Sequence, residues 1–76
     1  MKLPQASGRE VIKALSKAGF IVDRQRGSHV RLIKVEGAEV RKITVPVHSN
    51  RPLKPGTLLR IIKDAELTKE QFYELL

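Results

Sequence analysis

The sequence predicts an α+β fold, in which a helix is followed by a three-stranded antiparallel sheet and then by one or two helices. Three observations support this order. Apolar residues recur at helical spacing near the start of the chain, alternate with polar residues over residues 20–48, and return to helical spacing after residue 54. A chain of 76 residues has room for one small core. We therefore expect one domain over residues 1–76, with helices on one face of the sheet and the other face open.

The first helix is predicted to begin after Ser7. Ser7 and Glu10 have the spacing of a capping box, in which each side chain accepts a hydrogen bond from the other residue's backbone N–H. Gly19 is expected to end the helix in a left-handed conformation, with Phe20 folding back on Leu15. One row on this helix is basic and comprises Arg9, Lys13 and Lys17. That row fits a solvated face and a phosphate-binding face equally well.

Three segments with alternating side chains are predicted to be strands, over residues 20–25, 29–35 and 41–48. Burial of one face fixes their register. Phe20 and Val22 reach the core face if a three-residue loop, 26–28, joins the first two strands. A four-residue turn between the last two strands then pairs Leu32 with Ile43.

The other face of this predicted sheet is open to solvent. The same loop pairs Gln25 with His29 and Asp23 with Arg31. Pro46 lies across from His29, and because proline cannot donate to a ladder, the third strand should be an edge. The open face then carries a polar set, namely Asp23, Gln25, His29, Arg31 and Thr44.

A second helix is predicted to begin at Pro55, because proline suits the first helical position. Its apolar stripe consists of Leu58, Ile61, Ile62 and Ala65, and Leu59 is expected to add to the core. Thr68 and Gln71 form a second capping box, with Leu67 and Phe72 at the positions of a hydrophobic staple. A short terminal helix should therefore end the chain.

The charge balance points to a polyanionic partner. Fifteen Lys and Arg residues against eight Asp and Glu residues give a net charge of +7. On a small surface this charge attracts nucleic acid, which we expect as the partner. The chain has no cysteine for a disulfide or a thiolate metal site. It has neither a secretory leader pattern nor an apolar run of membrane-spanning length, so we expect a cytoplasmic protein.

His29 is the candidate catalytic residue. It follows a Gly-Ser turn at the start of the central strand and points to the open face, where an imidazole can exchange protons near neutral pH. The competing interpretation is a surface histidine with no role. Flanking basic residues and Ser28 favour the functional interpretation, and they make up the candidate phosphate-binding set of Arg24, Arg26, Ser28, Arg31, Lys34 and Lys54.

The sequence offers two further candidate sites, a metal site and a Ser-His dyad. His48 is a possible auxiliary acid or base, but with His29 it lacks the carboxylate or cysteine that would complete a metal site, so no metal or cofactor is expected. Ser28 is adjacent to His29 and would project to the opposite side of the strand, which argues against a Ser-His dyad. A turn-forming role for Ser28 is favoured.

These segments together resemble a known family. A helix, then "GF", "RQRGSHVRL", "ITVPVH" and "LKPGTLLRIIKDAELTKEQF" is similar to the HicA family of type II toxins, small ribonucleases that cut messenger RNA. The resemblance covers nearly the whole chain, and its most specific element is the Gly-Ser-His triplet. It implies a double-stranded-RNA-binding-domain-like fold, His29 as the catalytic residue and a HicB-type antitoxin as protein partner.

A metal-independent endoribonuclease is therefore the expected function, with His29 as general acid and base. The alternative is a non-catalytic RNA-binding module of the same fold, in which His29 only contacts RNA. A third possibility is an interaction protein whose basic face docks an acidic partner. The Gly-Ser-His placement alone favours the enzyme.

Overall fold

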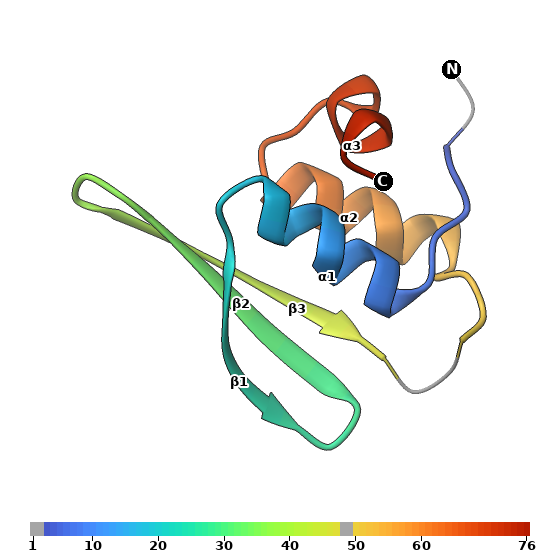
Figure 1. Cartoon of the computed structure of the whole chain (residues 1–76), viewed down its shortest axis with the longest axis horizontal. Coiled ribbons are helices and arrows are strands. Elements are labelled where there is room, and N and C mark those ends of the chain that lie inside the picture. The colour runs from blue at the N-terminus through green and yellow to red at the C-terminus, as the bar shows by residue number, and fades with distance from the viewer. Residues whose placement is uncertain (1–2, 48–49) are drawn as a thin grey trace.

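The computed structural model describes residues 3–47 and 50–76, and it has the predicted α+β order (Figure 1). Its elements are α1 (Gly8–Lys17), β1 (Ile21–Arg26), β2 (His29–Glu36), β3 (Glu39–Pro46), α2 (Pro55–Asp64) and α3 (Lys69–Leu75). The strands form one antiparallel sheet in the order β1-β2-β3. This arrangement is that of a double-stranded-RNA-binding-domain-like fold, and two short helices follow the sheet.

Helix α1 begins and ends as its sequence predicts. The Ser7 hydroxyl accepts a hydrogen bond from the Glu10 N–H, and the Glu10 carboxylate accepts one from the Ser7 N–H at 3.0 Å. At the other end Gly19 has a φ of 101°, and the Phe20 N–H donates to the Leu15 carbonyl at 3.0 Å. These bonds form a Schellman motif, which reverses the chain and places buried Phe20 at the start of the sheet.

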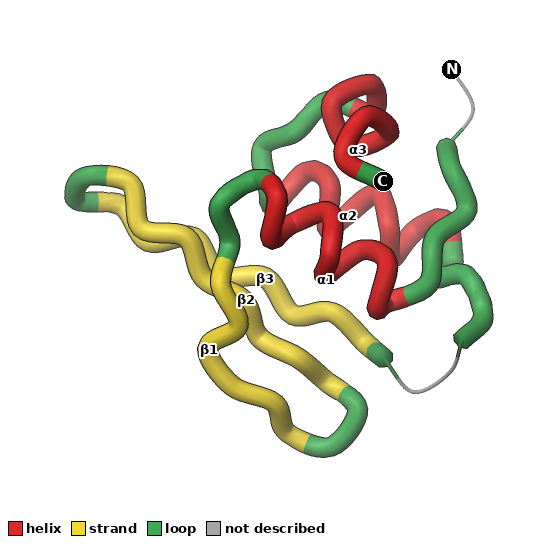
Figure 2. The backbone as a smooth tube through the Cα atoms, viewed as in Figure 1, coloured by secondary structure: helices red, strands yellow, loops and turns green. Residues whose placement is uncertain are grey.

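The helices lie together on one side of the sheet (Figure 2). Helices α1 and α2 pack over β3, and α3 packs against α1. The core between these layers includes Leu15, Phe20, Leu32, Leu58 and Phe72, all nearly inaccessible to solvent. The prediction that Leu59 joins this core is wrong, because Leu59 is 43% exposed on the solvent side of α2.

Strands β2 and β3 pair as predicted. Val30 lies opposite Val45, Leu32 opposite Ile43, and all four side chains are buried. His29 lies opposite Pro46, which ends β3 at the sheet edge. The strand itself is displaced from the predicted range, since it begins at Glu39 and ends at Pro46.

The predicted register of β1 against β2 is wrong. The hairpin turn contains two residues, so Arg26 lies opposite His29 and Gln25 opposite Val30. Between Val22 and Arg24 the strand β1 advances by two residues while β2 advances by one, which makes Asp23 the extra residue of a bulge.

Val22 was also assigned wrongly to the core. Val22 lies opposite buried Leu32, but it is 54% exposed. The physical reason is that β1 packs mainly against β2, whereas the main contacts between the helices and the sheet fall on β3. Every residue of β1 is therefore exposed, including those on the helix-facing side.

Helices α2 and α3 also begin where predicted. Pro55 is the first residue of α2, and the Thr68–Gln71 capping box opens α3 with both of its hydrogen bonds present. Between these helices Glu66 has a φ of 55°. The Glu66 and Leu67 N–H groups donate to the Lys63 and Ile62 carbonyls, which is a second Schellman motif with a non-glycine residue in the left-handed position.

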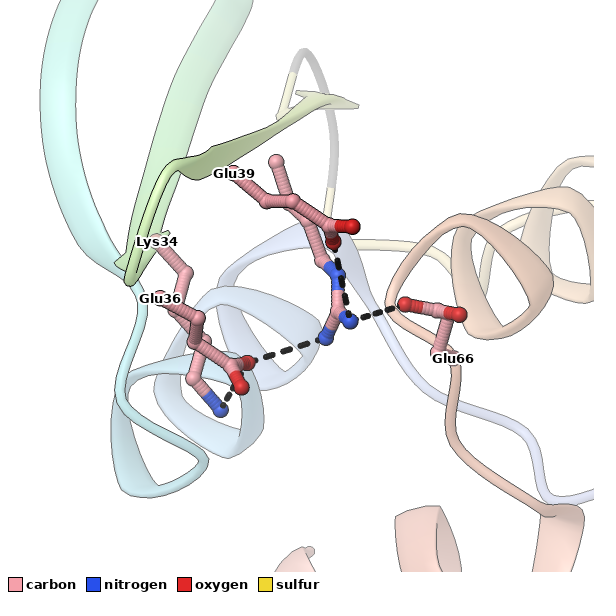
Figure 3. Close-up of polar contacts among 5 residues, drawn as sticks. Lys34, Glu36, Glu39 and Glu66 are labelled. Carbon is pink, nitrogen blue, oxygen red and sulfur yellow. Dashed lines mark hydrogen bonds and ion pairs between the residues drawn. The ribbon is translucent and has the colours of Figure 1, made fainter.

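An ion-pair cluster ties the β2–β3 hairpin to this turn (Figure 3). The Arg41 guanidinium contacts the carboxylates of Glu36, Glu39 and Glu66, and Lys34 pairs with Glu36 at 3.3 Å. Acidic side chains are thereby gathered at the hairpin end of the sheet. Within the described residues, no helix has the length and apolar character needed to cross a membrane.

Candidate active site

His29 is the first residue of β2 and directly follows the β1–β2 turn. Gly27 has a φ of 59°, a conformation that suits the first central position of a tight hairpin turn and that glycine adopts without strain. The Gln25 side-chain amide donates to the Gly27 carbonyl at 3.0 Å and braces the turn. His29 is exposed, and its strand position turns its side chain to the face opposite buried Val30.

The bulge at Asp23 determines which side chains share that open face. Residues directly opposite one another in a ladder project to the same face. Arg24 lies opposite Arg31, and Arg26 lies opposite His29. All three arginines therefore lie on the open face with His29, in place of the predicted Asp23 and Gln25.

A pocket of about 630 Å³ opens beside His29. The start of β2, the end of β3, residues 51–54 and the first turn of α2 contribute to its lining. The lining residues are His29, Pro46, Arg51, Pro52, Leu53, Lys54 and Thr57.

Long-range backbone contacts hold these walls together. The Val47 N–H donates to the Ser28 carbonyl at 2.7 Å, and the Leu53 N–H donates to the Ala6 carbonyl at 2.8 Å. Gly8 lies so close to Pro46 that a Cβ on Gly8 would be 2.0 Å from the Pro46 carbonyl oxygen. The start of α1 therefore fixes both the end of β3 and the segment that leads to α2.

The basic residues near His29 differ in their ion pairing from those near the β2–β3 turn. Within the described parts of the chain, no carboxylate forms an ion pair with the Arg24, Arg26, Arg31 or Lys54 side chains, whereas Arg41 has three carboxylate partners. Opposite charges therefore neutralise one another near the β2–β3 turn. Among the described residues, the four cations near His29 have no carboxylate partner. This end of the sheet therefore favours the binding of a phosphate.

The structure does not bring every predicted residue to this site. Lys34 projects to the helix-facing side of the sheet, where its Nζ lies 5.8 Å from the centroid of the Phe20 ring and pairs with Glu36. Ser28 is partly buried in the turn, and its carbonyl accepts a hydrogen bond from the Val47 N–H. His48 lies outside the described residues.

Several pocket residues were not singled out from the sequence. Arg51, Pro52, Leu53 and Thr57 join His29 and Lys54 in the lining. The Pro-Gly-Thr start of α2 was visible in the sequence as a helix signal, but its position beside β2 depends on long-range contacts. The basic row on α1 contributes nothing to the pocket lining. Among the described residues, no group of three or more His, Cys, Asp or Glu side chains is placed to hold a metal ion.

An exposed imidazole beside uncompensated cations has a definite chemical capability. The imidazole can take a proton from a bound hydroxyl and return it, and guanidinium or ammonium groups can hold a phosphate oxygen through charge-assisted hydrogen bonds. The arrangement therefore suits a phosphodiester substrate.

Comparison with known families agrees with this assignment. The sequence model of the family described as HicA toxin of bacterial toxin-antitoxin matches residues 8–67, which is most of the chain and includes α1, the whole sheet and α2. No curated protein sequence matches at a significant level. The chain therefore belongs to the HicA toxin family of bacterial toxin-antitoxin systems, and this membership implies an antitoxin as its partner.

Proposed function

We propose that this toxin is an endoribonuclease that cleaves messenger RNA, with His29 as its general acid and base. The observation that carries the proposal is the position of His29, which is exposed, lines a pocket of about 630 Å³ and lies on the same sheet face as three arginines. A nuclease needs a group that moves protons and cations that accept developing negative charge. Both lie at one end of the sheet.

In the proposed reaction the ribose 2′-hydroxyl is the nucleophile. His29 removes its proton, the 2′-oxygen attacks the adjacent phosphorus, and the bond from phosphorus to the 5′-oxygen breaks. The imidazolium then returns a proton to the departing 5′-oxygen. The products are a 2′,3′-cyclic phosphate and a 5′-hydroxyl, and no other reactant is consumed.

The cations act on the phosphate. Arg26 lies opposite His29 in the ladder, and Arg24 and Arg31 form the next pair along the same face. Lys54 lines the same pocket as His29. Their positive charge stabilises the non-bridging oxygens as negative charge accumulates in the transition state.

The partner is proposed to be a HicB-type antitoxin that covers the open face and blocks access to His29. An mRNA substrate places the protein in the cytoplasm. Ser28 is proposed to shape the turn that presents His29, and His48 is proposed as an auxiliary acid or base.

The test is cleavage of an RNA of mixed single-stranded and hairpin structure in excess EDTA, followed by identification of the new ends. The proposed mechanism gives 2′,3′-cyclic phosphate ends at a rate that EDTA leaves unchanged. An RNA methylated at every 2′-oxygen is the matched control and should remain intact. Products with 3′-hydroxyl ends that form only with added magnesium contradict the mechanism. Binding without any cleavage favours the RNA-binding module instead.

A further inference from the structure

The pocket beside His29 has a chemically mixed lining. Pro46, Pro52 and Leu53 contribute apolar surface, whereas His29, Arg51, Lys54 and Thr57 contribute polar or charged groups. Its volume of about 630 Å³ lies within the range of roughly 300 to 1,000 Å³ typical of sites for small organic ligands. One nucleotide is a ligand of that size, and a nucleic-acid duplex is far larger.

The apolar part of the pocket lining suits a nucleic-acid base and not a phosphate. Proline offers a ring face without an N–H donor, so Pro46 and Pro52 supply van der Waals contact to a flat partner and no hydrogen bond to an anion. Among the cations that favour phosphate, Arg26 lies opposite His29 across the ladder, and Arg51 and Lys54 line the pocket together with His29. A nucleotide with its base inside the pocket would have its phosphate beside His29.

A base can enter this pocket only if it is unpaired. In an A-form duplex each base is stacked and paired, and proteins read such duplexes by shape and backbone. Resting on the proposed ribonuclease function, we infer that the pocket binds the base of one unpaired nucleotide adjacent to the scissile phosphate, so that the substrate is single-stranded or bulged RNA. The protein therefore has a double-stranded-RNA-binding-domain-like fold but does not use duplex RNA as its substrate.

Thr57 is the residue that contacts the edge of the bound base. It is partly buried in the first turn of α2, and its hydroxyl forms no hydrogen bond with another described residue. A hydroxyl both donates and accepts, so it can bond to any of the four bases. Thr57 should consequently produce a modest preference among bases and not an absolute one.

The decisive substrate is a 2′-O-methyl RNA strand with a single unmodified ribonucleotide, because only one bond in it can be cut. Its cleavage is measured with that nucleotide unpaired, bulged from a duplex, or fully paired. The inference predicts cleavage of the unpaired and bulged forms at least about tenfold faster than the paired form, since extraction of a paired base is costly. Equal or faster cleavage of the paired form would overturn it while leaving the ribonuclease proposal intact.

Failure of the proposed function has a different signature. If no form is cut, the enzyme proposal fails, and the pocket is tested by the affinity of the fully methylated strands. Tighter binding of the unpaired or bulged strand than of the duplex supports the pocket, and equal or tighter binding of the duplex overturns it.

Thr57 is tested with the near-isosteric Thr57→Val and with Thr57→Ser, which keeps the hydroxyl. Loss of one neutral hydrogen bond should change the relative cleavage rates of substrates with different bases about two- to tenfold in Thr57→Val, and Thr57→Ser should retain the parent order. Circular dichroism checks that both variants are folded. A folded Thr57→Val with the parent preference among all four bases would contradict the assigned role.

Discussion

Arg24 lies directly opposite Arg31 across the β1–β2 ladder, although strict alternation from Val22 would place Asp23 or Gln25 on the open face. Two like charges in a directly opposed pair destabilise a sheet unless an anion lies between or over them. The bulge at Asp23 therefore creates a basic surface beside His29 at a cost in local stability. The proposed RNA substrate would supply the anion that offsets this cost.

Arg26→Gln should weaken RNA binding more than an equal loss of charge elsewhere. If Arg26 contacts one phosphate, its removal lowers the slope of log affinity against log salt by about 0.7 for single-stranded RNA. Binding titrations over a range of salt concentrations measure that slope. Arg60→Gln is the matched control, because Arg60 is an exposed residue of α2 and, among the described residues, forms its ion pair with Asp64 at 4.0 Å. Identical slopes for both variants would show that only net charge matters.

Gly8 and Gly56 should respond oppositely to replacement by alanine. A Cβ at Gly8 would lie 2.0 Å from the Pro46 carbonyl oxygen, so Gly8→Ala must displace α1 or β3 and should cost about 1 to 3 kcal/mol of unfolding free energy. A Cβ at Gly56 meets nothing within 4 Å, and alanine is the better helix former, so Gly56→Ala should gain up to about 1 kcal/mol. Urea unfolding compares them. A neutral Gly8→Ala contradicts the close packing.

Glu66 combines an unfavourable backbone conformation with a favourable ion pair. Glu66→Ala removes the pair with Arg41 and keeps a φ near 55°, whereas Glu66→Gly removes both the pair and the strain. Glycine should therefore be more stable than alanine at this position by about 1 kcal/mol. Thermal unfolding of the two variants gives the difference. Equal stabilities would indicate that the left-handed conformation costs nothing here.

The capping box of α1 predicts a defined pH dependence. Hydrogen bonding from the Ser7 N–H, and secondarily with the Ser7 side chain, lowers the pKa of Glu10 below its ordinary value of 4.5. A carboxylate whose pKa is lowered by folding contributes stability that is complete above its unfolded pKa and is lost as pH falls through the folded pKa. Glu10→Ala should thus be less stable than the parent at pH 7, with the difference shrinking below about pH 4. A constant difference at all pH values would contradict the assignment.

Much of the fold follows from local sequence signals. Ser7 and Glu10, Gly19 and Pro55 each act on neighbouring residues, so the ends of the helices were predictable. The β2–β3 register was also predictable, because burial on one face leaves a single alignment of Val30 with Val45.

The β1–β2 register was not predictable in the same way. The predicted register placed Val22 in the core, but the main helix contacts fall on β3, and Val22 is 54% exposed. The strands are instead joined by a two-residue turn that contains Gly27, and Asp23 is the extra residue, which forms a bulge. The pocket had no local signal either, because Leu53 and Thr57 are far from His29 in the sequence, and the Leu53 N–H is held by the distant Ala6 carbonyl.

The most direct test of the account compares RNA cleavage by the parent protein and by His29→Ala, with EDTA present. General acid and base catalysis contributes about 10²- to 10⁴-fold, so the variant should lose at least about 100-fold in cleavage rate. His29 is exposed and is not one of the buried core residues, so the variant should keep the parent's circular dichroism spectrum and bind RNA with similar affinity. A folded His29→Ala that cuts RNA at the parent rate would contradict the central claim.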